Sequence, residues 1–411
     1  MKILSMAAGL TLLAISAAQA QFDAPVYHYQ GTLEADPGTG HIAADWQIDL
    51  LAGQSGALTF VLAPSLGNIA INGDITGFET GEQGPFQSLT LHLEDGAQHI
   101  GIRYDGVLLP EPMDNDINAV TPERVELTID SFWLPVDAGF RGFFTTDLTV
   151  DVGAPWRAVA NGEVIPEPSG ARIINSGPSL DIAFTLAPGF RVSGQEGYTL
   201  FDLRDHDEGT DRLIAAADFC FDYLNARFGA RDPLPRASFV IHRRSESAYN
   251  RRAYITLTDI SDTPDDRLTQ FVCHELAHHW SAGADFMTVE NWLNESFAEY
   301  TGVMALRERY GEAAFLNRMN GFRDQVAGQA LPPVWVPGAT DRGPYLVNYR
   351  AGPIALWHLE TYLGRPAFHR FITRYMVDGI DTTPDLLAML EEIAGHEARD
   401  WFENRLAHSG P

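Results

Sequence analysis

The sequence contains His274-Glu275-Leu276-Ala277-His278, followed after sixteen residues by Glu295 in Asn291-Trp292-Leu293-Asn294-Glu295-Ser296-Phe297-Ala298. Residues four apart on an α-helix lie about 5–6 Å from one another on one face, so His274 and His278 can bind the same ion. A carboxylate from the following helix supplies a third ligand. The spacing therefore predicts one zinc ion per chain, held by His274, His278 and Glu295.

Zinc held by two histidines and a carboxylate keeps a fourth position open for water, whose pKa the metal lowers to about 7. Such a site needs a group that takes the proton from the water, and a carboxylate directly after the first histidine is placed for this. Glu275 is the predicted general base. An ordinary helix face with two histidines is the alternative, and the second motif argues against it.

Composition and the N-terminal residues together indicate an exported globular protein. The chain has 411 residues, of which 45% are hydrophobic and 11% aromatic, enough for two packed domains. Its formal net charge of −27 excludes nucleic acid as an expected partner, because an acidic surface repels phosphate.

The first residues predict a cleaved signal peptide over residues 1–20, because Lys2 is followed by the apolar run 3–17 and by Ala18-Gln19-Ala20. No later segment is apolar enough to span a membrane, so a periplasmic or extracellular location is expected.

The periodicity of the sequence changes near residue 195. From Ala24 to about Val192, short alternating segments such as Ala57-Leu58-Thr59-Phe60-Val61-Leu62 are separated by turn residues, which predicts an N-terminal β-sandwich or saddle-like domain over residues 21–195. Residues 196–411 are predicted to form a mostly helical catalytic domain with a small sheet. Helices are expected over 210–228, 263–283, 294–310, 349–363, 366–377, 383–394 and 397–406, with strands at 237–242 and 253–258. The fold class is α+β.

Cys220 and Cys273 lie in different predicted helices. An oxidising compartment would allow a disulfide, but the sequence does not decide whether the two residues meet. Because the zinc site already has three ligands, Cys273 is expected to be a buried structural residue and not a ligand.

These motifs resemble the aminopeptidase N-like gluzincin metallopeptidases, whose zinc motif continues into Trp-Leu-Asn-Glu-Gly-Phe-Ala. Here that run is Trp292-Leu293-Asn294-Glu295-Ser296-Phe297-Ala298. The resemblance is close over residues 264–302 and loose over most of the remaining chain. It implies a thermolysin-like catalytic domain with a small mixed sheet, and peptides as substrates.

The resemblance also implies an oxyanion donor. In the family, a tyrosine in a Tyr-x-Lys-Gly motif donates a hydrogen bond to the tetrahedral intermediate, and Tyr349-Arg350-Ala351-Gly352 lies at a comparable distance downstream. A phenol can stabilise an oxyanion beside zinc. Tyr349 is therefore the expected donor, and a core aromatic residue at a helix start is the alternative.

Three departures from the family pattern stand out. The gap between His278 and Glu295 is shorter than usual. The Gly-x-Met-Glu-Asn motif, whose glutamate binds the free amino terminus of the substrate, is absent; Asn250 occupies its place and Glu246 lies nearby. The sequence ends at Pro411, so a short form without the large C-terminal helical domain is expected.

Other polar residues near the motifs have both functional and structural interpretations. Glu299 lies four residues after Glu295 and could bind the free nitrogen of a zinc-bound histidine, or it could be a solvated helix glutamate. His279 points about 100° further round the helix than His278 and is expected to be structural. His242 and His358 are expected to be structural as well.

The sequence thus predicts an exported zinc metallopeptidase that resembles an aminopeptidase but lacks the usual amine-binding motif. Another zinc hydrolase activity on the same scaffold, such as epoxide hydrolysis, is one alternative. A non-enzymatic binding protein with a relic site is the other. The oligomeric state does not follow from the sequence.

Overall fold

The structure, a computed structural model, describes residues 26–108, 117–244 and 248–408. The predicted signal peptide, residues 1–20, and Glu246 lie outside these ranges. Among the described helices, none combines the length and the apolar character that crossing a membrane requires.

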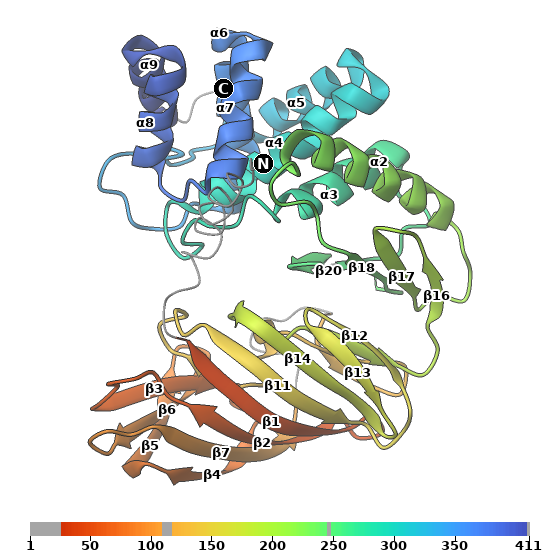
Figure 1. The fold of residues 1–411 in the computed structure, drawn as a ribbon, viewed down its shortest axis with the longest axis vertical. Helices are drawn as coiled ribbons and strands as arrows, with labels where there is room; N and C mark the ends of the chain where they lie inside the picture. The colour runs from red at the N-terminus through yellow and green to blue at the C-terminus, as the bar shows by residue number, and fades with distance from the viewer. Residues whose placement is uncertain (1–25, 109–116, 245–247, 409–411) are drawn as a thin grey trace, which may run out of the picture. The chain divides into compact units, whose positions relative to one another are not determined.

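The described residues of the N-terminal region form three sheets (Figure 1). The largest has the order β13 (Glu163–Glu167), β14 (Gly170–Ser179), β11 (Phe144–Asp151), β1 (Tyr27–Asp36), β2 (His41–Asp49), β7 (His99–Val107) and β4 (Gly67–Gly73). The second has the order β10 (Val136–Asp137), β3 (Ala57–Leu62), β6 (Phe86–Leu93) and β5 (Ile75–Gln83). The third has the order β12 (Arg157–Ala160), β15 (Phe184–Ala187), β9 (Val125–Leu127) and β8 (Ala119–Val120).

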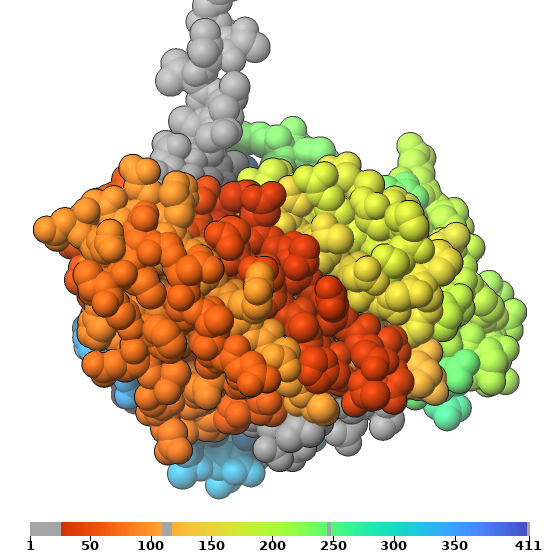
Figure 2. Space-filling view, turned by 90° about the horizontal axis from the view of Figure 1, so that it is seen from below, coloured from red at the N-terminus to blue at the C-terminus, as the bar shows by residue number. Residues whose placement is uncertain are grey.

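Alternating side chains explain how these sheets pack. Along β11, buried and half-exposed residues alternate strictly, as a strand with one face on a core requires. β1 pairs parallel with β11 and antiparallel with β2, so the first strand lies inside the sheet. Figure 2 shows this arrangement on one face, where red residues from the start of the chain lie between orange and yellow ones. All three sheets contribute to one apolar core.

A chain of hydrogen bonds holds the aromatic centre of that core. Trp46 Nε1 donates to Tyr104 Oη at 2.9 Å, and the Tyr104 hydroxyl donates to the Trp133 carbonyl at 2.5 Å. The indole nitrogen of Trp46 and the hydroxyl of Tyr104 are thereby satisfied without water.

A five-stranded mixed sheet follows, with the order β16 (Arg191–Gly194), β17 (Tyr198–Asp202), β18 (Ala237–Ile241), β20 (Tyr254–Leu257) and β19 (Tyr249–Arg251). β17, β18 and β20 are parallel, and the two edge strands are antiparallel to their neighbours. β18 and β20 are the two strands expected from the sequence.

The remaining elements are helical: the short 3-10 helix η1 (Ile129–Ser131), α2 (Thr210–Phe228), α3 (Asp265–Ala277), α4 (Asn291–Tyr310), α5 (Glu312–Val326), the π-helix η2 (Val347–Ala351), α6 (Gly352–Leu363), α7 (Arg365–Asp378), α8 (Thr383–Ala394) and α9 (His396–Ala407). α4 is buried on most sides and packs against α3, α5, α6 and η2. This confirms the α+β fold class, in which a domain of sheets precedes a mostly helical domain.

Several helix boundaries differ from the sequence prediction: α4 begins at Asn291 and not near residue 294, and α6 begins at Gly352 because the π-helix precedes it. α3 ends at Ala277 and not near Gly283, because tight turns follow in which the amides of His279 and Trp280 bond three residues back. It begins at Asp265, with Pro264 as its N-cap, and not at residue 263. The sequence also missed α5 and the π-helix η2.

By its packing, the chain divides into two compact units. One contains the described residues up to Asp205 together with Ala237–Asp259, and the other contains His206–Arg236 and the described residues from Ile260 onward. The five-stranded sheet thus belongs to the first unit. Within that unit, Arg251 Nε donates to Asp181 at 2.7 Å and the Thr185 and Tyr254 hydroxyls lie 2.7 Å apart, which ties this sheet to the preceding strands. The division at residue 195 stays a prediction.

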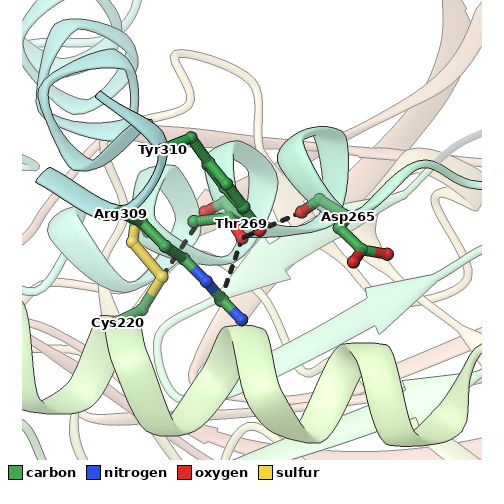
Figure 3. Close-up of a disulfide and its surroundings, with 6 residues drawn as sticks. Cys220, Asp265, Thr269, Arg309 and Tyr310 are labelled. Atoms are coloured by element: carbon green, nitrogen blue, oxygen red, sulfur yellow. Dashed lines mark hydrogen bonds between the residues drawn. A yellow bond between two sulfur atoms is a disulfide. The ribbon is translucent and has the colours of Figure 1, made fainter. Parts of the chain in front are cut away.

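A disulfide joins Cys220 on α2 to Cys273 on α3 (Figure 3), which answers the question that the sequence left open. The Cα atoms are 5.1 Å apart, and 53 residues separate the two cysteines in the chain. Beside it, the Thr269 hydroxyl lies 3.0 Å from both Arg309 Nη1 and the Tyr310 hydroxyl of α4. The disulfide therefore binds α2 to α3 one residue before His274, and the contacts of Thr269 bind α3 to α4 one helical turn earlier.

We expect the double substitution Cys220→Ala and Cys273→Ala to lower the free energy of unfolding by about 2–4 kcal/mol, because it releases a long loop in the unfolded chain. Urea unfolding in the presence of chelator measures the change without a metal contribution. The wild type with reductant should match the double variant, and reductant should not shift the variant further. An unchanged midpoint in both comparisons contradicts a stabilising disulfide.

Candidate metal centre

Two imidazoles on α3 converge on one point. His274 Nε2 and His278 Nε2 lie 3.2 Å apart, with the ring planes at 89°. Two nitrogens bonded to one tetrahedral zinc ion at about 2.0–2.1 Å would lie roughly 3.3 Å apart. His278 Nδ1 lies 3.0 Å from the Ser281 carbonyl, to which it can only donate, so Nε2 carries the lone pair. Both histidines are therefore arranged as ligands.

Glu295, in the first turns of α4, brings a carboxylate oxygen to the same point. Its Oε2 lies 3.8 Å from His274 Nε2 and 3.5 Å from His278 Nε2. This oxygen is buried and has no hydrogen-bond partner within the described chain. A buried, unpartnered carboxylate oxygen facing two ring nitrogens is what a bound cation would satisfy. The donor set fits zinc.

Glu275 is an alternative third ligand because it is close to both histidines, but its ligand atoms are spaced more widely than those of the set with Glu295. His274, Glu275 and His278 offer ligand atoms within 4.8 Å of one another, a wider set than the one with Glu295. Burial raises the pKa of Glu275, and the neighbouring His274 and His278 oppose that shift. Glu275 thus lies beside the two imidazoles, where the sequence predicts a general base.

Glu299 lies behind His274 and is only 7% exposed. Its Oε2 is 3.1 Å from His274 Nδ1, an ion pair at hydrogen-bond length whose alignment is poor, since Nδ1 makes no well-directed hydrogen bond. Its Oε1 accepts from Gln270 Nε2 at 3.0 Å and from Arg350 Nη1 at 2.9 Å. Burial would raise the pKa of Glu299, but His274, Arg350 and Gln270 hold it below its usual range.

The carboxylates give the site a negative potential. Burial disfavours a charged His274 ring, yet Glu299, Glu275 and Glu295 together raise the pKa of His274 to about 9. The same surroundings favour a divalent cation, which would replace the proton on Nε2.

Tyr349 lies on the π-helix and faces the same point. Its ring stacks on His274 with a centroid distance of 5.9 Å, and its hydroxyl lies close to the Glu295 carboxylate. Burial and the Glu295 carboxylate raise the pKa of Tyr349, so the phenol stays protonated and can donate. π-helical turns occur frequently at functional sites.

The π-helix is fastened to α4 next to Glu295. The Ser296 hydroxyl donates to the Asn348 carbonyl at 2.6 Å. Gly352 packs so closely on Ser296 that an added Cβ would lie 2.7 Å from Ser296 Cβ and closer still to its Oγ. Only glycine allows this approach, which fixes the distance between the metal ligands and Tyr349.

The short connection between α3 and α4 is ordered by side chains near its ends. The Ser281 hydroxyl donates to the Asn294 carbonyl at 2.8 Å. Asn294 pairs with the backbone of Ala284, accepting from its amide at 3.1 Å and donating to its carbonyl at 2.9 Å. The shortened gap is thus compatible with the three ligands meeting.

The other histidines singled out in the sequence lie elsewhere. His279 Nε2 pairs with Asp232 at 3.1 Å, and His242 is fully buried in the first unit, 3.3 Å from Glu126. His358 is partly buried on α6. Asn250 lies in the edge strand β19.

Sequence reasoning missed Gln270 and Arg350. Gln270 precedes His274 by four residues, so helical spacing alone could have placed it on the same face. Arg350 is next to Tyr349, but its contact with Glu299 spans 51 residues and had no local signal.

Residues 220–403 match the peptidase family M1 domain. The chain is 30% identical over 148 residues to aminopeptidase M1-A of Oryza sativa subsp. japonica, covering 32% of this chain and 17% of that relative. It is 25% identical over 217 residues to endoplasmic reticulum aminopeptidase 2 of Bos taurus, covering 47% of this chain and 22% of that relative. The chain thus spans between 17% and 22% of these curated relatives.

Solved structures with a similar fold include the M1 zinc metallopeptidase from Deinococcus radiodurans, with a TM-score of 0.66 at 16% identity over 95% of each chain. Yeast LTA4 hydrolase in complex with bestatin has a TM-score of 0.64 at 15% identity, over 92% of this chain and 66% of that chain. At these identities the likeness shows the fold alone.

We expect Gly352→Ala to lower the free energy of unfolding by about 1–3 kcal/mol, because the new methyl group overlaps Ser296. Gly321→Ala on α5 is the matched control, since an added Cβ there meets no atom within 4 Å. That control should be neutral or slightly stabilising. Urea unfolding of both variants measures the difference, and equal stabilities would show that the close approach is not required.

Proposed function

On the premise that the chain belongs to the aminopeptidase N-like gluzincin family, as its M1 domain match shows, we propose that it hydrolyses peptide bonds through Glu275 and Tyr349. The observation that carries the proposal is the unpartnered Glu295 oxygen facing the Nε2 atoms of His274 and His278. Zinc is the cofactor of this family, and these three side chains would hold it.

When bound, zinc would lower the pKa of a water molecule and polarise the substrate carbonyl. Glu275 accepts the proton of the attacking water and returns it to the leaving amine, which its buried position beside His274 permits. Tyr349 donates its hydroxyl proton in a hydrogen bond to the developing oxyanion. Glu299 orients the ring of His274 from the opposite side.

We propose peptides with a free amino terminus as substrates, on the likeness to aminopeptidases. The family's amine-binding glutamate is missing from its usual place, where Asn250 stands. Glu246, which could replace it, lies outside the described residues. Hydrolysis of another substrate class on the same scaffold is the second candidate, and the missing glutamate is the observation that favours it.

We also propose that the protein is exported. The disulfide between Cys220 and Cys273 supports this, because structural disulfides persist in oxidising compartments and are rare in the cytosol of most organisms. The basic and apolar start of the sequence is consistent with the same location.

Replacing Glu275 with Gln should reduce kcat by about 100- to 10,000-fold, because the amide cannot accept the proton. The zinc dissociation constant should change little, since Glu275 is not one of the three ligands. Glu308→Gln on the exposed side of α4 is the control and should keep full activity. Retained hydrolysis in the Glu275→Gln variant would reject the role of this residue.

A panel of matched peptides with free and acetylated amino termini tests the substrate class. We expect the free peptides to be cleaved and the acetylated ones to be cleaved far more slowly. Chelator should abolish the activity and zinc should restore it. Equal cleavage of both sets would exclude recognition of the amino terminus, and no cleavage by the zinc-loaded protein would favour another substrate class.

A further inference from the structure

Arg350 is a buried cation between the metal site and the turn that carries Tyr349. Its side chain is 11% exposed. Nη1 donates to Glu299 Oε1 at 2.9 Å and to the Tyr349 carbonyl at 2.7 Å. Nη2 donates to the Tyr345 hydroxyl at 2.7 Å, and Nε donates to Gln325 Oε1 at 2.6 Å. All three nitrogens of the guanidinium are thus engaged, each in a different direction.

The charge of Arg350 balances a crowded set of carboxylates. Glu275, Glu295 and Glu299 are all at most 15% exposed at the side chain and surround the same histidine. A buried carboxylate without a compensating cation is strongly destabilising. Arg350 contacts Glu299, which lies on the Nδ1 side of His274 and not on the Nε2 side where the ligand atoms meet, so Arg350 compensates a charge that a bound metal would not contact.

The contacts of Arg350 also reach the aromatic side of the site. The rings of Tyr345 and Tyr349 stack at 4.7 Å, and the ring of Tyr349 stacks in turn on His274 at 5.9 Å. Tyr345 is 58% exposed, so packing alone does not hold it. The hydrogen bond from Arg350 to its hydroxyl does.

We propose that Arg350 is a positioning residue that sets His274 and Tyr349 relative to each other. Through Glu299 it holds the ring of His274 from behind, and through the Tyr349 carbonyl and Tyr345 it holds the phenol in front. The part of this inference that concerns Tyr349 rests on the proposed function. The part that concerns His274 rests only on metal binding.

A simple packing role is the competing explanation. The Arg350 guanidinium lies 4.5 Å from the centroid of Phe322, as many structural arginines do. Arg318 lies over the same ring, at 4.9 Å. It provides a matched control, because its removal takes a cation from Phe322 without touching Glu299.

The experiment compares Arg350→Met with Arg318→Met in the full chain. Competition with a chelator measures the zinc dissociation constant. Hydrolysis of a peptide with a free amino terminus measures kcat and KM. We expect Arg350→Met to weaken zinc binding about 10- to 100-fold and to lower kcat by at least as much, with KM nearly unchanged. Arg318→Met should change zinc affinity less than about twofold. Arg350→Lys should fall in between, because an ammonium keeps the charge but not the planar fork.

A double-mutant cycle with Glu299→Gln tests the route to the metal. If Arg350 acts on His274 through Glu299, adding Arg350→Met to Glu299→Gln should change zinc affinity by less than about twofold. If the double variant loses zinc affinity by the product of the losses in the two single variants, this route is wrong. Equal zinc affinity and kcat in Arg350→Met and Arg318→Met would overturn the proposal as a whole.

Two further outcomes are distinguishable. If circular dichroism shows that Arg350→Met does not fold, Gln325→Leu removes only the outer anchor of the guanidinium. It should shift zinc affinity and kcat in the same direction by a smaller factor, and the absence of any shift overturns the proposal.

If the zinc-loaded wild type cleaves no peptide, the proposed function fails. The zinc affinities of the variants still decide whether Arg350 supports His274.

Discussion

One electrostatic constraint underlies the site: three ligand atoms with negative or lone-pair character are held together in a buried place. Glu295 Oε2 and the Nε2 atoms of His274 and His278 lie between 3.2 and 3.8 Å from one another. Without a metal ion, a proton on His274 offsets part of this repulsion, and the scaffold must hold the arrangement against the rest. The disulfide beside α3 and the buried packing of α4 provide that rigidity.

Local spacing explains what the sequence could predict. His274, Glu275 and His278 follow from helical geometry, and Glu295 follows from a motif in the next helix, so no long-range information was needed. The alternation of apolar residues likewise predicted an N-terminal domain of sheets, and the strands at 237–241 and 254–257 were recognisable. Each of these features depends on residues close together in the chain.

What the sequence could not predict depends on contacts between distant residues. The pairing of Cys220 with Cys273 and the contact of Arg350 with Glu299 join separate helices, and neither leaves a periodic pattern. The parallel pairing of β1 with β11 spans more than a hundred residues, so alternation could indicate the strands but not their neighbours. The end of α3 at Ala277 follows from the turns behind it, where a continued apolar pattern suggested a longer helix.

The π-helix has a consequence for how the site and its scaffold can change. A single π-turn arises when an α-helix accommodates one additional residue, and the register of the helix shifts at that point. Loss of Ala351, which lies between Tyr349 and α6, would restore ordinary helical geometry and rotate the preceding side chains by about 100° relative to α6. The buried face of α6 would keep its packing while the phenol turned away. A single-residue deletion could therefore separate folding from chemistry in this protein.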